Sequence, residues 1–365
     1  MEFLILVFIT SFMLVLVVTP SLIKVAVLKR LFDDPNEKRK LHNRAIPTIG
    51  GVILFAGTLF SFSLWFPRNL IHDPIIELKA MDDYKYIVCT LLIMFFVGIK
   101  DDIIGTAPVK KLIAHMMVSM ILVLMADIRI VSMYGIFGVH ELPYWASIFL
   151  SIFTYIVVVN AFNLIDGVDG LASGIGLIAS VAFGAWFAFA GDFVMACLAI
   201  ALAGSLSAFL FFNFSPAKIF MGDSGSLTIG LIICVLAIKL ISFDVSTIQN
   251  EFLLKISKPI FAMAVLVYPL TDTLRIFIYR TVRGLSPFSA DRNHLHHRLI
   301  DIGCNHKKTV LILYLVNIAI ISLCLSLTYI NPTYIFIIIF FVTLILAQVP
   351  FFIKKHKPNH NHSKK

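Results

Sequence analysis

Long runs of apolar residues constrain this chain more than any other feature. Hydrophobic residues make up 59% of it and charged residues only 14%, whereas soluble domains carry about 25% charged residues. A helix needs about 20 consecutive, mainly apolar residues to cross a bilayer. The sequence therefore predicts an all-α, polytopic membrane protein. We expect about eleven transmembrane helices, at residues 3–23, 48–66, 84–99, 112–126, 145–162, 171–190, 193–212, 226–242, 259–279, 309–329 and 333–353.

The basic residues predict the orientation. If the N-terminus is outside, 22 of the 30 Lys and Arg residues fall in inner segments and seven lie in or near outer ones. Because Lys and Arg concentrate in cytoplasmic loops, this split favours an outside N-terminus and a cytoplasmic C-terminus. This distribution of basic residues is not typical of a nucleic-acid-binding patch. We expect residues 1–353 to form one membrane domain and residues 354–365 a basic cytoplasmic tail near anionic headgroups.

Five unusual polar clusters all fall on the predicted inner side. They occupy residues 38–51, 100–111, 160–170, 220–226 and 286–297. Because the sides were assigned from charge alone, this coincidence favours one aqueous site built from five loops. A membrane transporter is the alternative from another class, but carriers usually place their ionisable residues near the middle of the membrane.

Acidic residues mark two of these clusters. Asp101 and Asp102 are adjacent at the end of a predicted span. Neighbouring carboxylates repel unless a cation or a shared proton relieves them, and a solvated loop pair is the plainer alternative. Asp223 lies in Gly-Asp-Ser-Gly-Ser just before a span that starts on the inner side. That helix end favours phosphate or a metal–phosphate complex, although a plain N-cap is the alternative.

A third cluster carries oxygen ligands at regular spacing. Asn160, Asn163, Asp166 and Asp169 recur every three residues, so on a helix they share one face. Hard oxygen ligands of this kind suit Mg²⁺ or Mn²⁺; a capped helix end is the alternative. His115, inside a predicted span, is instead expected to be a core residue whose hydrogen bonds are satisfied.

The last cluster contains the sequence HLHH. His294, His296 and His297 could bind zinc, but no carboxylate–histidine helix motif accompanies them. Arg292 and Arg298 lie alongside, so contact with phosphates or sugar hydroxyls is the favoured interpretation, with metal binding or a purely structural role as alternatives.

With these motifs the chain resembles the polyprenyl-phosphate N-acetylhexosamine-1-phosphate transferases, over about residues 1–330. AIPTIGG, the Asp pair, NxxNxxDGxDGL, FMGDSGSL and HLHH carry the resemblance. The stretch SPFSADRNHLHHRL is most similar to bacterial enzymes that move N-acetylglucosamine 1-phosphate from UDP-N-acetylglucosamine to undecaprenyl phosphate. The muramoyl-pentapeptide branch typically has a Pro-x-HHH type motif, which this chain lacks.

The resemblance implies eleven spans, a bacterial inner-membrane location and the first membrane step of a cell-envelope polysaccharide pathway, with UMP as the second product. Transfer from another UDP-N-acetylhexosamine stays an alternative, and a homodimer is one of the assemblies left open. It implies Mg²⁺ (or Mn²⁺) at Asp223 with Asn163, and catalytic roles for Asp101, Asp102 and Asp223. The substrate contacts that it implies are Lys110, near the lipid phosphate, and Asp166, Asp169, Arg292, His294, His296 and His297.

Overall fold

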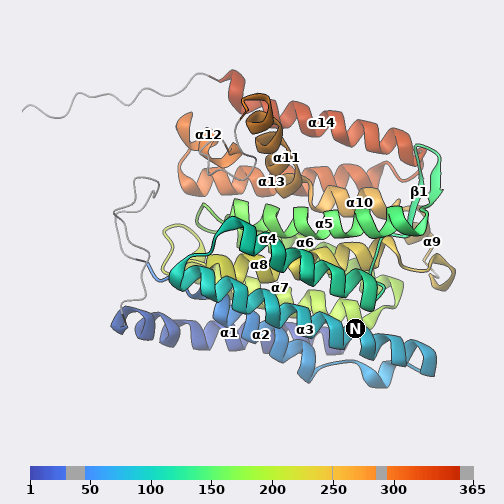
Figure 1. Ribbon diagram of the computed structural model, residues 1–365, viewed down its shortest axis with the longest axis horizontal. Helices are drawn as coiled ribbons and strands as arrows, with labels where there is room; N and C mark the ends of the chain where they lie inside the picture. The colour runs from blue at the N-terminus through green and yellow to red at the C-terminus, as the bar shows by residue number, and fades with distance from the viewer. Residues whose placement is uncertain (30–45, 249, 285–293, 354–365) are drawn as a thin grey trace, which may run out of the picture.

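The computed structural model describes residues 1–29, 46–248, 250–284 and 294–353, most of them helical (Figure 1). Most helices run along the long axis of the molecule, with α12 and the β1–β2 hairpin at opposite ends. The helices are α1 (Glu2–Leu28), α2 (Gly50–Leu64), α3 (Pro74–Ile104), α4 (Pro108–Met120), α5 (Tyr144–Ile165), α6 (Leu171–Ala190), α7 (Phe193–Asn213), α8 (Gly222–Ile241), α9 (Glu251–Lys255), α10 (Lys258–Val265), α11 (Val267–Val282), α12 (Leu295–Asp301), α13 (His306–Ser326) and α14 (Pro332–Phe352). Short helical turns occupy Arg68–Leu70, Ile121–Met125 and Val245–Thr247, and the strands are β1 (Ser132–Ile136) and β2 (Val139–Glu141).

The described part of the chain contains eight helices that are long and apolar enough to cross a membrane, or nine if α10 and α11 form one broken span. Each of the eleven predicted segments falls on helical structure, so the polytopic helical fold is confirmed. The count of eleven is not, because α2 has only 15 residues. The 31-residue helix α3 carries charged residues toward both ends, and these interrupt its apolar run.

One small element departs from the all-α prediction. β1 and β2 form an antiparallel hairpin between α4 and α5. Gly135 and Gly138 have positive φ angles of 85° and 75°, a conformation that glycine adopts without steric cost. Two glycines so close together interrupt a helix, and the sequence analysis did not interpret them as a turn.

Helix α8 is the most enclosed of the candidate spans, with 94% of its apolar window buried. Two glycines let neighbouring helices approach its first turn. A Cβ at Gly51 of α2 would lie 2.1 Å from the backbone nitrogen of Gly225, and one at Gly98 of α3 would lie 2.4 Å from Cα of Ser224. Small residues permit such backbone contacts between membrane helices. The start of α8 is therefore held from two sides.

The span made of α10 and α11 is bent by 75° at its break. A break frees backbone groups that must find other partners inside a membrane. Asn317 of α13, fully buried, provides them. Its side chain accepts from the backbone nitrogen of Tyr268 at 3.3 Å and donates to the carbonyl of Val265 at 3.2 Å. The bend is thus stabilised by a specific side chain.

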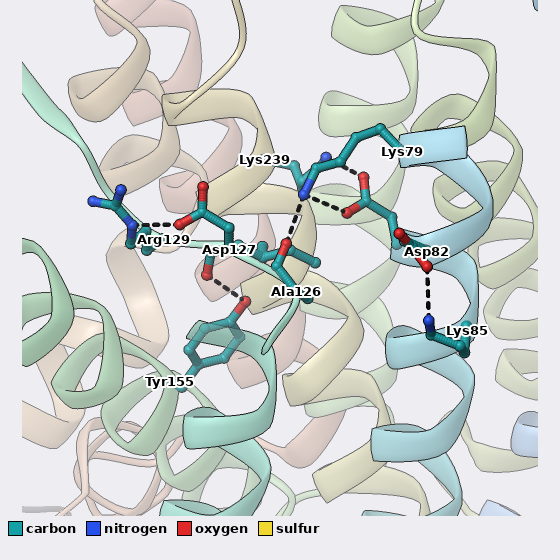
Figure 2. Close-up of polar contacts among 10 residues, drawn as sticks. Lys79, Asp82, Lys85, Ala126, Asp127, Arg129, Tyr155 and Lys239 are labelled. Carbon is teal, nitrogen blue, oxygen red and sulfur yellow. Dashed lines mark hydrogen bonds and ion pairs between the residues drawn. The ribbon is translucent and has the colours of Figure 1, made fainter. Parts of the chain in front are cut away.

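Charged residues at the hairpin end are largely paired with one another. Lys79 donates to the carbonyl of Ala126 at 2.7 Å and lies 3.4 Å from the buried carboxylate of Asp83 (Figure 2). Lys239 of α8 also pairs with Asp83, and Lys85 pairs with Asp82 at 2.7 Å. This network ties α3 to α8, and it leaves little unbalanced charge there.

Candidate active site

Asp102 closes the N-terminus of α8. Its Oδ1 accepts from the backbone nitrogen of Asp223 at 2.6 Å, and its Oδ2 accepts from the backbone nitrogen and the hydroxyl of Ser224 at 3.0 and 2.7 Å. The first N–H groups of a helix have no partner within the helix, and a carboxylate there is further stabilised by the helix dipole. The Asp pair that ends α3 therefore fixes where α8 begins.

Asp223 projects from this turn between a cation and an amide. Its Oδ2 accepts from the ammonium of Lys111, and its Oδ1 accepts from Nδ2 of Asn163 at 2.9 Å. Asn163 also donates to Ser226 at 3.0 Å. Lys111 bridges to Oδ2 of Asp101 at 2.8 Å. The structure thus brings together four side chains from α3, α4, α5 and α8.

The glycine-rich end of the first motif docks on the loop before α8. Gly50 and Gly51 donate their backbone N–H groups to the carbonyls of Phe220 and Met221 at 2.9 and 2.7 Å. Gly222 has a φ of 70°, and a Cβ there would lie 2.4 Å from the carbonyl oxygen of Thr48. Only glycine fits at that position. Two of the predicted clusters therefore build one wall of the site.

The loop between α5 and α6 forms a second wall. Asp169, buried, accepts from the backbone nitrogen of Ala217 at 3.0 Å. Asn213 accepts from the backbone nitrogen of Gly170 at 3.1 Å and donates to the carbonyl of Ile219 at 3.0 Å. Asp169 thus anchors the loop, a geometry that indicates a structural task besides the predicted substrate contact.

Asp166 lies in the same loop, one residue beyond α5. Burial raises the pKa of its carboxyl well above the ordinary value, and the negative charges of Asp223 and Asp102 raise it further. Neighbouring carboxylates disfavour the anionic form of this carboxyl, and a cation that binds nearby stabilises that form. Asp166 therefore adds to the acidic character of the site.

The three histidines of HLHH lie together. The rings of His294 and His296 stack at a centroid distance of 5.2 Å and an interplanar angle of 6°, and His296 lies 4.4 Å from His297. Burial lowers the pKa of His296 to about 3, so this ring is neutral near pH 7.

His296 also links the histidine cluster to the acidic loop. Its buried Nε2 has no hydrogen-bond partner within the described ranges. A Cβ placed on Gly167 would lie 3.5 Å from that nitrogen. The DGVDG loop and the HLHH segment, more than 120 residues apart in sequence, are thus in contact. Arg292 lies outside the described residues, and its role stays a prediction.

The adjacent residues Lys110 and Lys111 lie in different surroundings. Lys110, predicted to contact the lipid phosphate, is exposed; the next residue, Lys111, is the one that reaches the acids. Adjacent lysines differ by about 100° around a helix, and the resemblance that implied Lys110 did not say which of the two faces inward. His115, one turn after Lys111, is buried as expected, but over the described residues neither ring nitrogen has a hydrogen-bond partner.

The residues present fit a hard divalent cation. Asp101 and Asp223 share the ammonium of Lys111, and the negative charges of Asp102 and Asp223 act on Asp166. Oδ1 of Asp101 is buried without a hydrogen-bond partner among the residues described. In the same part of the chain no three Asp, Glu, His or Cys side chains are already arranged to hold a metal ion. Magnesium often takes one or two carboxylates and completes its shell with water and substrate phosphates. This donor set suits that mode.

The sequence is similar to known transferases. Residues 84–241 match the model of Glycosyl transferase family 4. The chain is 31% identical, over 96% of its length and 93% of the relative's, to a probable undecaprenyl-phosphate N-acetylglucosaminyl 1-phosphate transferase of Bacillus subtilis (strain 168). It is 33% identical to a decaprenyl-phosphate N-acetylglucosaminephosphotransferase of Mycolicibacterium smegmatis (strain ATCC 700084 / mc(2)155), over 76% of this chain and 71% of that one. It is 28% identical to an undecaprenyl-phosphate alpha-N-acetylglucosaminyl 1-phosphate transferase of Salmonella typhi, over 80% and 75%.

Proposed function

Since the chain belongs to glycosyl transferase family 4 and is a membrane phosphoglycosyl transferase, we propose that it transfers N-acetylglucosamine 1-phosphate from UDP-N-acetylglucosamine to undecaprenyl phosphate. The products are undecaprenyl-diphospho-N-acetylglucosamine and UMP. The observation that carries the proposal is the Asp101–Lys111–Asp223–Asn163 network at the start of the buried helix α8. It gathers phosphate-handling groups at one end of a bundle of apolar helices.

We propose direct attack as the mechanism. An oxygen of the lipid phosphate bonds to the β-phosphorus of the sugar nucleotide while the bond to UMP breaks. A phosphate monoester has its second pKa near about 6 and needs little help from a base near neutral pH. The ammonium of Lys111 stabilises the phosphoryl oxygens. Asp101 holds that ammonium in place at 2.8 Å.

A covalent phosphoryl-aspartate is the rival route, and the two acids differ as candidates for it. Both oxygens of Asp102 already accept from the first turn of α8. Oδ1 of Asp101 has no such partner among the described residues. Exchange of labelled UMP into UDP-sugar by delipidated protein would favour the covalent route, because direct attack requires the lipid.

Mg²⁺ or Mn²⁺ is the proposed cofactor. Asp223 would be its main ligand, with Asn163 beside it and Asp101 within the same network. The bound ion would neutralise the diphosphate and the departing UMP. Lys111 must then share Asp223 with the cation or move closer to a substrate phosphate. The charge excess of the acids supports this assignment.

We also propose eleven spans with the N-terminus outside, in the inner membrane of a bacterial cell. Under this arrangement the ends of α3 and α5 and the start of α8 face the cytosol, where nucleotide sugars are made. The lipid enters from the side and the nucleotide from the water. The positive-inside distribution of Lys and Arg supports this orientation.

A panel of UDP-sugars tests the proposal. Protein purified in nanodiscs with undecaprenyl phosphate is given UDP-N-acetylglucosamine, UDP-N-acetylgalactosamine, UDP-glucose and UDP-N-acetylmuramoyl-pentapeptide, and UMP release is measured. We expect release with UDP-N-acetylglucosamine and only in the presence of lipid. A preference for UDP-N-acetylgalactosamine would assign the same reaction to another sugar. No release with any donor would refute the proposed function.

A further inference from the structure

Asp272 is a buried acid that lies outside the metal-and-lysine network. It is 0% exposed, on the helix α11 that follows the break in the bent span. Its Oδ2 lies 2.8 Å from Nδ1 of His294, and its Oδ1 accepts from the backbone nitrogen of Leu295 at 2.8 Å. Arg275, one turn later, lies 3.5 Å from the same carboxylate. The acid therefore binds the HLHH segment twice.

The first of these contacts fixes a ring. An ionised carboxylate only accepts hydrogen bonds, so Nδ1 of His294 must carry the proton. Its Nε2 is then left to contact another group, and the ring cannot turn without losing the bond to Asp272. A partner of this kind sets both the tautomer and the orientation of a functional histidine.

The second contact fixes the backbone. Leu295 is the first residue of α12, and His294 precedes it. The N–H of Leu295 has no partner within the helix, and Asp272 supplies one. The same carboxylate thus holds the ring of His294 and the start of the helix that carries His296 and His297.

Tyr268 acts on the next ring from the same face of α11, four residues before Asp272. Its hydroxyl lies 3.3 Å from Nδ1 of His296. The Nε2 of His296 is directed toward Gly167 in the acidic loop, and the ring is 0% exposed. Two residues on one turn of α11 therefore orient two stacked histidines over the DGVDG loop.

The bend makes this geometry possible. Asn317 holds the break just before Tyr268, so the direction of α11 is fixed where the two side chains depart from it. We propose that Asp272 and Tyr268 are positioning residues of the transferase: Asp272 orients His294 for contact with the diphosphate of the sugar nucleotide, and Tyr268 holds His296 against the acidic DGVDG loop. This proposal rests on the proposed function and assigns the bent span to donor recognition.

The test is a double-mutant cycle with separate constants for the two substrates. Asp272→Asn keeps the shape of the side chain but removes the charge that pairs with His294. We expect the KM for the UDP-sugar to rise about tenfold or more, with the KM for undecaprenyl phosphate nearly unchanged. If Asp272 acts through His294, the double variant Asp272→Asn with His294→Ala is no worse than His294→Ala alone.

Two further variants keep the test decisive. Tyr268→Phe removes one hydroxyl and leaves the packing intact, so it replaces Asp272→Asn if that variant does not fold, and it also raises the donor KM. Asp83→Asn is the matched control, because Asp83 is a buried acid that pairs with Lys79 and Lys239 instead of with the histidines. This variant lowers thermal stability without changing the donor KM selectively.

The outcomes separate the two proposals. Absence of UMP release by the wild-type protein contradicts the proposed function. An active wild type whose Asp272→Asn and Tyr268→Phe variants keep the wild-type donor KM contradicts the positioning role. Additive effects in the cycle, or an equal rise in both KM values, also contradict it, because they indicate that Asp272 only supports the fold.

Discussion

The acids around the start of α8 are all aspartates, but their hydrogen-bond partners differ. Asp102 gives both oxygens to the N–H groups of α8, whereas Asp223 is shared by Lys111 and Asn163. Asp101 keeps one oxygen free of hydrogen bonds to the described residues. A buried acid whose partners are backbone groups is a structural support, and one that faces an ammonium and an amide side chain is available for chemistry.

Replacing Asp223 by Asn should therefore abolish transfer without preventing folding. The amide keeps the size of the side chain but removes the charge that a hard cation requires. We expect a loss of activity of at least about a hundredfold, together with loss of wild-type activity in EDTA and its recovery on adding Mg²⁺ or Mn²⁺. Asp82→Asn, an acid paired with Lys85 at the other end, serves as the control. Full wild-type activity in chelator would contradict the metal assignment.

The two adjacent lysines give a second prediction. Lys111→Gln removes the only cation seen between Asp101 and Asp223 in the described residues, so kcat should fall by roughly two decades, about 3 kcal/mol. Lys110→Gln, on the exposed side of the helix, should cost far less. Steady-state kinetics on both variants test this prediction. A larger loss of kcat for Lys110→Gln than for Lys111→Gln would contradict it and would support the substrate contact predicted for Lys110 from the sequence.

At the scale of elements, the close contacts around α8 matter most. Glycines in α2 and α3 let their backbones touch the first turn of α8, and the carboxylate of Asp102 then fits its N–H groups. Because interiors are densely packed, a small displacement of one helix here moves the turn that carries Asp223 and Ser224.

Gly98→Ala should therefore inactivate the enzyme. The added Cβ would lie 2.4 Å from Cα of Ser224, a backbone atom that cannot move aside on its own. We expect the free energy of unfolding to fall by roughly 2–3 kcal/mol, which lowers the melting temperature. We also expect kcat to fall by more than this loss of stability alone explains. Gly176→Ala is the control, because its Cβ meets only side-chain carbons, the nearest at 3.1 Å. Equal behaviour of the two variants would argue against a tightly set α8.

At the scale of the whole molecule, the proposed topology can be tested by labelling. In a variant without the five native cysteines, a cysteine replacing Lys308 should react with a membrane-impermeant maleimide only in inverted vesicles. A cysteine replacing Arg68 should react in intact cells, because the positive-inside distribution puts that residue outside. The opposite pattern would contradict the orientation, and labelling of both residues from one side would contradict the proposed topology.

The sequence predicted those features that depend on residues close together in the chain. Apolar runs predicted the helices well, α6 to the residue, and motif chemistry selected Asp101, Asp223 and Asn163, which the fold brings together. Features that depend on the rotation of a helix about its axis or on long-range packing were not predictable from the sequence. The choice of Lys111 over Lys110 depends on helix phase. Asp272 was not identified from the sequence because its partners His294 and Leu295 are 22 and 23 residues away, and no local pattern predicts that contact.

The most direct test of the account follows two labels through one reaction. UDP-N-acetylglucosamine carrying ³²P at its β-phosphate and tritium in its sugar is incubated with purified protein, Mg²⁺ and undecaprenyl phosphate. Both labels should enter the lipid in equal amounts, with one unlabelled UMP released for each lipid product, and Asp223→Asn should transfer neither label. Entry of tritium without ³²P, with UDP as the product, would contradict the account, since it would mean transfer of the sugar alone.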